Sequence, residues 1–159
     1  MKKQGNPASP AAPREGSPLL APRHPIIAGY DGSASARNAL AYASGLARSA
    51  HRPLLLMHVA HVPSYAGPAT AELTSLSNDT EKVEKWLRSE LDQVAIHNGV
   101  DVYVHARQGS PARQLLAAAV EYSADALVVG ASAGPWHYVA GSLGARLVKR
   151  ARCPVIVVP

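Results

Sequence analysis

Four stretches of the chain are short and almost continuously apolar, and each is closed by glycine, proline or polar residues. Runs of this kind are typical of strands buried on both faces, as in a parallel sheet. They cover residues 26–30, 53–59, 125–130 and 155–158. A fifth candidate strand begins at Val100, where valines alternate with polar residues. This alternation predicts a strand with one wetter face, as at the edge of a sheet.

Helical patterns separate these strands. After a turn at Asp31-Gly32-Ser33, a helix capped by Ser33 or Ser35 continues to Ala50 with a face of mostly small residues, which lets a helix lie close on a sheet. A second helix follows Asn78 or Asp79 with apolar residues three and four apart. Two more helices are predicted over residues 112–122 and 142–151. Alternating strands and helices predict an α/β fold with five strands and four helices, whose strand order the pattern leaves open.

Charge and composition narrow the class of protein. The chain has 159 residues and a net charge of +5, of which residues 1–24 carry +3 and the remainder +2. Residues 1–24 are rich in proline and are expected to be a disordered tail before one domain at 25–159. The domain lacks the dense basic face that nucleic acid requires. With no apolar run as long as a membrane span and no secretory signal, we expect a cytoplasmic protein.

Candidate chemistry lies where the predicted strands end. Doubly wound sheets bind ligands beyond the carboxyl ends of their strands. At the first such end, Asp31 is either a hydrogen-bond acceptor for a ribose or base, or the acceptor of a local Asx turn. At the fourth, Gly130 closes the strand and Gly141-Ser142 opens a helix. Ser142 is either an N-cap or part of a phosphate site formed by free N–H groups, and both roles are compatible.

Six short motifs together resemble the universal stress protein family over nearly all of residues 25–159. They are Asp31-Gly32-Ser33, His58-Val59, Gly109-Ser110-Pro111, Val128-Val129-Gly130, Gly141-Ser142 and Cys153-Pro154-Val155. The resemblance implies a Rossmann-like parallel sheet in the order 3-2-1-4-5, with helices on both faces, as in adenine nucleotide alpha hydrolases. It also implies a homodimer and, in one branch of the family, ATP binding, with or without Mg. The implied nucleotide-binding residues are Gly29, Asp31, Ser33, Val59, Val129, Gly130, Ala133, Gly141, Ser142 and Leu143.

The loop after the fourth strand departs from the nucleotide-binding pattern of this family. That pattern resembles glycine, two residues, glycine, nine residues and then glycine followed by serine or threonine. Here ten residues separate Gly130 from Gly141, and Ala133 takes the place of the second glycine. A methyl group at that position hinders close approach of the backbone to phosphate. Nucleotide binding therefore depends on whether the shortened loop still encloses a ligand.

Other constellations carry less weight. His58 and His61 have no carboxylate or cysteine nearby in the sequence, so no metal site is expected. There is no P-loop and no nucleophile elbow, and no catalytic residue is assigned. Cys153 starts an apolar strand and is expected to be packed rather than reactive. Arg146 lies one turn after Ser142, and would reach a phosphate if it pointed inward.

The last apolar stretch, Val155, Ile156, Val157 and Val158, bears no charge. In the strand order implied by the resemblance it lies at a sheet edge, where pairing with a second copy would satisfy its open backbone groups. Taken together with the family resemblance, these features predict an adenine nucleotide-binding protein that acts in a stress response and is not an enzyme. Two alternatives remain open: a dimeric interaction module without nucleotide, and a weak ATP-hydrolysing enzyme.

Overall fold

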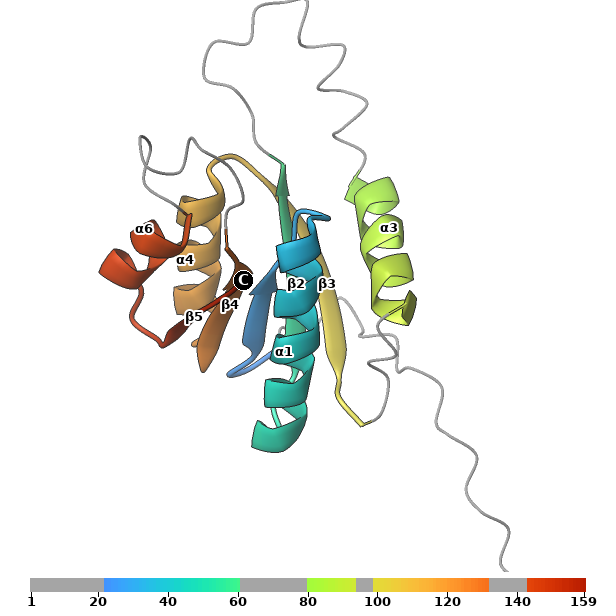
Figure 1. The fold of residues 1–159 in the computed structure, drawn as a ribbon, viewed down its shortest axis with the longest axis horizontal. Helices are drawn as coiled ribbons and strands as arrows, with labels where there is room; N and C mark the ends of the chain where they lie inside the picture. Colours follow the sequence, from blue (N-terminus) through green and yellow to red (C-terminus); the bar gives the residue numbers. More distant parts are fainter. Residues whose placement is uncertain (1–21, 61–79, 94–98, 132–142) are drawn as a thin grey trace, which may run out of the picture.

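The structure is a computed structural model that describes residues 22–60, 80–93, 99–131 and 143–159. Strands and helices alternate along the chain, as predicted (Figure 1). The strands are β1 (Ile26–Gly29), β2 (Leu54–Ala60), β3 (Val102–Gln108), β4 (Ala126–Gly130) and β5 (Val155–Val158). The helices are α1 (Ala34–Ala50), α3 (Thr80–Gln93), α4 (Pro111–Glu121) and α6 (Leu143–Arg150).

All five strands form one parallel sheet in the order β3-β2-β1-β4-β5. Ile27 of β1, for example, is in register with Leu55 of β2 on one side and with Leu127 of β4 on the other. The order that the family resemblance implied is therefore confirmed. The prediction of an edge strand after Val100 is also confirmed, although β3 begins at Val102 and continues to Gln108.

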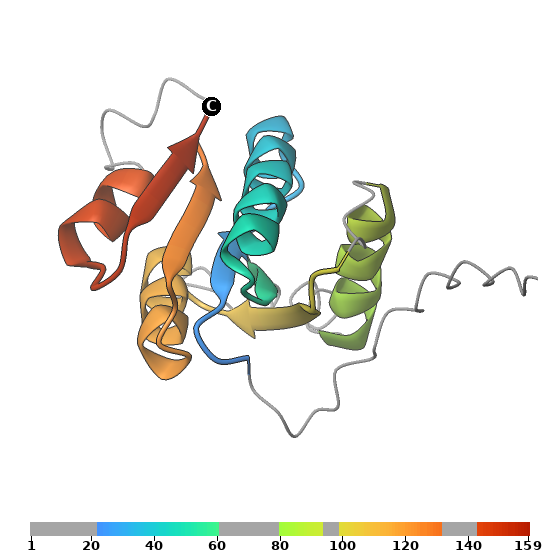
Figure 2. The same cartoon turned by 90° about the horizontal axis from the view of Figure 1, so that it is seen from below.

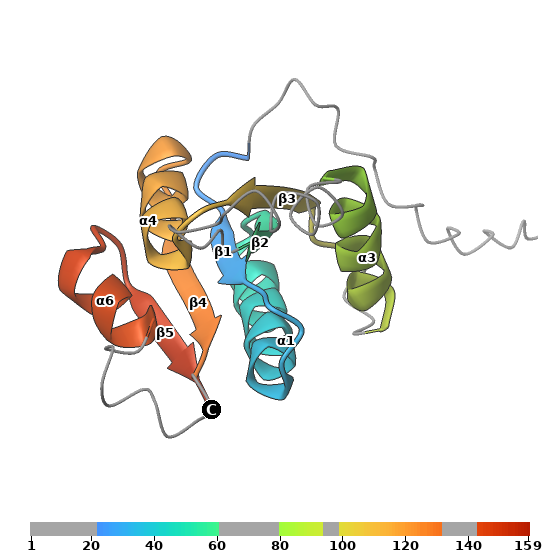
Figure 3. The same ribbon diagram turned by 90° about the horizontal axis from the view of Figure 1, so that it is seen from above.

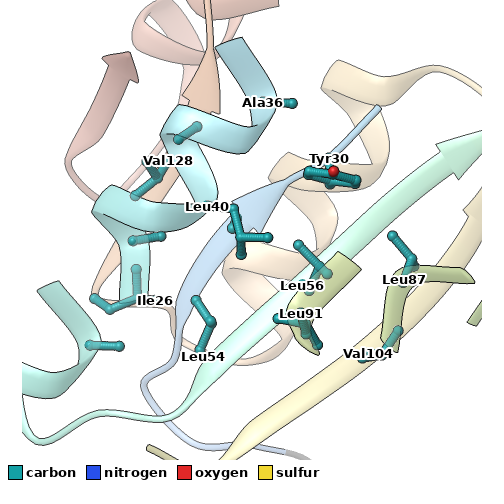
Figure 4. Packing of buried hydrophobic residues seen from close by; sticks show 14 of the residues in the cluster. Ile26, Tyr30, Ala36, Leu40, Leu54, Leu56, Leu87, Leu91, Val104 and Val128 are labelled. Carbon is teal, nitrogen blue, oxygen red and sulfur yellow. The ribbon is translucent and has the colours of Figure 1, made fainter. Parts of the chain in front are cut away.

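The sheet lies between two layers of helices, with α1 and α3 on one face and α4 and α6 on the other (Figures 2 and 3). Because successive side chains of a strand point to opposite faces, Ile26 and Ala28 pack under α1 while Ile27 packs under α4. Figure 4 shows the first of these cores, where Leu87 and Leu91 of α3 face the strands. Both cores are apolar, which explains why β1, β2 and β4 read as continuous hydrophobic runs.

Helix α1 begins and ends as its sequence predicts. Ser33 is the N-cap, and its hydroxyl accepts a hydrogen bond from the N–H of Ala36 at 3.1 Å. The face against the sheet consists of Leu40 and four alanines, all almost fully buried. The chain leaves the helix at His51, which adopts a left-handed conformation with φ of 52°. Small side chains thus allow α1 to lie close to β1 and β4, both of which it contacts.

The N-terminal residues bear on the prediction of a disordered tail over residues 1–24. Residues 1–21, most of the predicted tail, lie outside the described residues. Pro22 is buried, and the N–H of His24 donates to the carbonyl of Tyr122 at 3.1 Å, so contacts with the domain begin within the last residues assigned to that tail.

Among the described residues, none of the helices combines the length and the apolar content needed to cross a bilayer.

Candidate functional site

The strand order places a crevice between β1 and β4. After β1 the chain passes to α1 on one face of the sheet, and α6, which follows β4 in the chain, lies on the opposite face. Neighbouring strands whose connections diverge in this way open a cleft beyond their carboxyl ends. A pocket of about 290 Å³ lies there, bounded by β1, β2, β4 and the N-terminal parts of three helices. The topology therefore places a ligand-sized pocket where doubly wound sheets bind ligands.

Seven of the ten predicted site residues line this one pocket. They are Gly29, Asp31, Ser33, Val59, Val129, Gly130 and Leu143. The other three, Ala133, Gly141 and Ser142, lie outside the described residues. Seven further residues complete the described lining, and the sequence did not single them out as site residues: Tyr30, Ser35, Ala36, Met57, Pro111, Leu115 and Ala131.

The polar rim of the pocket is formed by the turn between β1 and α1. Asp31 is exposed, and its Oδ1 accepts a hydrogen bond from the N–H of Ser33 at 3.0 Å. The Asx turn expected from the sequence is therefore formed. Among the described residues, no partner holds the other oxygen, Oδ2. The carboxylate thus shapes the turn with one oxygen and offers the second one to a ligand.

A hydrogen bond joins the two sides of the crevice, and the sequence did not predict it. The hydroxyl of Ser35, in the first turn of α1, donates to the carbonyl of Ala131 at 2.9 Å. The backbones are so close here that a Cβ atom on Gly130 would lie 2.6 Å from the carbonyl carbon of Ser35. Glycine at position 130 is therefore required by the approach of α1, whether or not a phosphate binds nearby.

The inner wall of the pocket is apolar. Met57 and Val59 contribute from β2, Val129 from β4, and Pro111 and Leu115 from α4. A pocket with apolar walls and a few polar groups at its rim is typical of sites for small organic ligands. The contribution of α4 was missed because it comes from a distant part of the chain; the motif Gly109-Ser110-Pro111 was the only local signal.

Behind the rim, Tyr30 anchors the turn to helix α3. Its side chain is buried and its hydroxyl donates to the carboxylate of Glu90, which also receives the Nε–H of Arg37 at 3.4 Å. The ring of Trp86 lies against Tyr30, with centroids 5.5 Å apart. The hydrogen bond from Tyr30 lowers the pKa of Glu90, and burial together with this carboxylate raises the pKa of Tyr30 to about 12. A buried carboxylate paired in this way stays ionised at neutral pH.

His58 belongs to this anchor. Its Nδ1 donates to the backbone carbonyl of Tyr30 at 2.8 Å, and its ring meets Trp86 edge-on with centroids 5.4 Å apart. His61 lies outside the described residues. Within the described part of the chain, no three histidine, cysteine or acidic side chains lie close enough together to hold a metal ion.

Arg146 does not line the pocket. It is exposed on α6 and lines a separate hollow between α4 and α6, on the outer side of these helices. The residue that α6 turns toward the pocket is Leu143. The condition under which Arg146 would reach a phosphate in the pocket is therefore not met.

Comparison with known proteins agrees with this architecture. Residues 22–159 match the sequence model of the universal stress protein family. The chain belongs to this family. A universal stress protein of Thermus aquaticus is 32% identical over 136 residues, which cover 84% of this chain and 96% of that protein. The universal stress protein MJ0531 of Methanocaldococcus jannaschii is 26% identical over 136 residues, covering 84% of this chain and 80% of that protein.

Solved structures of the universal stress protein family have the same fold. The universal stress protein UspA from Lactobacillus plantarum has a TM-score of 0.72 at 23% identity, and the match covers 86% of this chain and 99% of that one. A universal stress protein in complex with cAMP has a TM-score of 0.68 at 23% identity, covering 87% and 99%. A family member from Arabidopsis thaliana with AMP bound has a TM-score of 0.57 at 19% identity, covering 86% and 91%.

Proposed function

We propose that this universal stress protein binds an adenine nucleotide in the pocket between β1 and β4. The observation that carries the proposal is the convergence of seven predicted nucleotide-binding residues, from four separate segments of the chain, on one cavity. The complexes of related folds with cAMP and AMP support the ligand class. A role in a stress response, which only the family suggests, and a cytoplasmic location are part of the same proposal.

The chemistry of the lining fits such a ligand. Val59, Val129 and Leu115 offer apolar surface to a purine ring. The free oxygen of Asp31 is an acceptor for a ribose hydroxyl or for the amine of adenine. Gly130 and the start of α6 at Leu143 border the place where the family pattern puts phosphate, and we assign Ala133, Gly141 and Ser142 to the same phosphate site by that pattern.

The size of the pocket favours a compact ligand. A volume of about 290 Å³ lies at the lower end of the range for small-molecule sites, about 300–1,000 Å³. Both solved complexes named above hold a nucleotide with a single phosphate. ATP, with or without Mg, is the ligand implied by the resemblance, and a titration that compares AMP, cAMP, ADP and ATP decides between them.

The test is calorimetric titration of the purified protein with these four nucleotides, together with mass analysis of any small molecule released on denaturation. Asp31→Ala removes the exposed acceptor, and we expect it to weaken binding about tenfold or more, as loss of a charge-assisted hydrogen bond does. Asp101→Ala is the matched control, because Asp101 is also exposed but directly precedes β3, at the other end of the sheet. No heat and no released nucleotide would contradict the proposal, as would equal loss in both variants.

A second candidate function, an interaction module without nucleotide, is favoured by the free edge of the sheet. β5 lies at this edge and none of its residues is charged. Val157 is 43% exposed. We propose a homodimer in which Val155, Ile156, Val157 and Val158 pair with their copies across a two-fold axis. Such a dimer is compatible with nucleotide binding, so the calorimetric result alone separates the two functions.

Weak ATP hydrolysis is the third alternative. No histidine, cysteine or lysine belongs to the described lining of the pocket, so that part of the site offers no general base beyond Asp31. We therefore assign no catalytic residue and propose binding rather than turnover. Phosphate release that scales with protein concentration and disappears in Asp31→Ala would contradict this assignment.

A further inference from the structure

Two hollows that the nucleotide pocket does not use lie along α4, the first beside α6 and the second beside the segment that joins α6 to β5. The first has a volume of about 380 Å³, and the second about 300 Å³. The first is lined by Ser110, Ala112, Arg113, Leu116, Arg146 and Arg150. The second is lined by Ala119, Val120, Ser123, Ala124, Arg152 and Cys153. We refer to these two hollows together as the basic furrow.

The two hollows follow one another along α4. Leu116 in the first and Val120 in the second are one helical turn apart, and Arg150 and Arg152 are close neighbours in the chain. Since an α-helix rises 1.5 Å per residue, the stretch from Ser110 to Ser123 corresponds to about 20 Å. The furrow therefore has the length of a short peptide segment rather than of a single anion.

The charge along the furrow is of one sign. Arg113 stands on α4, Arg146 and Arg150 lie one turn apart on α6, and Arg152 follows that helix. None of these four guanidinium groups forms an ion pair with a carboxylate of the described residues. α6 has no acidic residue, and the one acidic residue of α4, Glu121, is held by Arg107 at 2.7 Å. The four charges are thus available to an acidic partner.

The furrow also has apolar surface. Leu116 is partly buried against the core, and Val120 is 60% exposed. Arginine side chains beside exposed aliphatic groups suit a helix that carries carboxylates on its flanks and leucine-like residues along one face. Nucleic acid is a poorer match, because the net charge of residues 25–159 is only +2.

We propose that the basic furrow is a docking site for an acidic amphipathic helix of a partner protein. It is separate from the nucleotide pocket, because Leu115 and Leu143 of the same two helices line that pocket while Arg113 and Arg150 line the furrow. The furrow follows α4 and is bordered by α6 and by the segment that leads from α6 to β5, so its lining is distinct from the free edge of β5. The proposal does not depend on nucleotide binding.

The test uses the full-length protein and a synthetic, fluorescein-labelled peptide of about 14 residues, the number whose helix spans about 20 Å. The peptide carries glutamates and aspartates, with leucines one turn apart on one face. A peptide of the same composition, with the leucines scattered, is the control for the apolar contact. Binding is measured by fluorescence anisotropy and located by amide chemical shifts, and the protein variants are checked by circular dichroism.

We expect binding in the micromolar range that shifts amides of α4 and α6. Arg113→Glu with Arg150→Glu should weaken it at least about tenfold, which corresponds to about 1.4 kcal/mol. Lys85→Glu with Arg88→Glu, the matched reversal of two exposed charges on α3, should leave binding within about twofold, because α3 covers the opposite face. Val120→Ser should weaken binding several-fold with little effect on stability, because Val120 is mostly exposed.

Four results would overturn the proposal. They are absence of peptide binding up to about 1 mM, equal loss in the α3 control, equal binding of the peptide with scattered leucines, and tighter binding of a short DNA duplex through the same arginines. The last result would identify a nucleic-acid surface. None of these outcomes bears on the calorimetric test of the nucleotide pocket, so failure of the two proposals is distinguishable.

Discussion

The anchor behind the pocket rim gives a sharp prediction for Tyr30→Phe. This change removes only the hydroxyl that donates to Glu90, while the buried ring keeps its contact with Trp86. A buried carboxylate that loses such a donor costs about 1.5–3 kcal/mol, since the hydrogen bond is to a charged group. Arg37, which also contacts this carboxylate, has a half-exposed side chain and compensates only in part. We therefore expect the free energy of unfolding to fall by about 2 kcal/mol at neutral pH.

The pH dependence of this loss tests its cause. In the folded protein the hydrogen bond from Tyr30 lowers the pKa of Glu90. The stabilisation is therefore fully present above the ordinary glutamate pKa of about 4.3, and it is lost as the pH falls through the lower folded value. The difference in the free energy of unfolding between the parent protein and Tyr30→Phe should accordingly shrink in acid, where Glu90 is protonated in both proteins.

Urea unfolding followed by circular dichroism, at neutral pH and at an acidic pH where the protein remains folded, measures both effects. Tyr42→Phe is the matched control, because Tyr42 is 52% exposed on α1 and its loss of a hydroxyl should be nearly neutral. Combining Tyr30→Phe with Glu90→Leu should cost less than the sum of the single changes, since the second change removes the unpaired carboxylate. A loss below about 0.5 kcal/mol, or one that is unchanged in acid, would refute this account of Glu90.

Three further predictions concern other parts of the fold. Gly130→Ala should lower the melting temperature by overpacking against Ser35, at a cost of about 1–3 kcal/mol. Gly45→Ala should not lower it, because a Cβ atom at that position meets nothing within 4 Å. Equal effects of the two changes would contradict the close approach of α1. Burial raises the pKa of Cys153, so its alkylation at neutral pH should be slow and should accelerate on unfolding; equal rates in both states would contradict it. Val157→Lys should convert the proposed dimer to a monomer in light scattering, and an unchanged mass would exclude β5 as the interface.

Much of the fold could be predicted from local patterns. β5 occupies Val155–Val158 as expected, and α1 begins after Ser33, one of its two predicted caps. Such features can be predicted because strand formation by an apolar run, and helix capping by a hydroxyl beside free N–H groups, depend on only a few neighbouring residues. The strand order came from the family resemblance, because pairing between strands depends on contacts that no local pattern records.

Some residues of the candidate site could likewise be predicted from local patterns, and others could not. Asp31 and Gly130 were found because each marks a strand end with a residue type that is unusual there. Leu115 was not found, because an ordinary leucine in an amphipathic helix becomes pocket lining only when α4 closes over the end of β1. The sequence left open whether Arg146 points toward the pocket or away from it, and only the packing of α6 decided between the two.

The sequence by itself determined where strands and helices lie, where glycine and aspartate interrupt them, and hence which strand ends are chemically unusual. Only the tertiary structure decided that Tyr30 meets Glu90 sixty residues further along the chain, and that arginines of α4 and α6 share one furrow. The physical reason is that these features depend on interactions over different separations along the chain. Hydrogen-bonding preferences and hydrophobic periodicity act between near neighbours, whereas a pocket or a furrow exists only after distant segments have excluded water from between them.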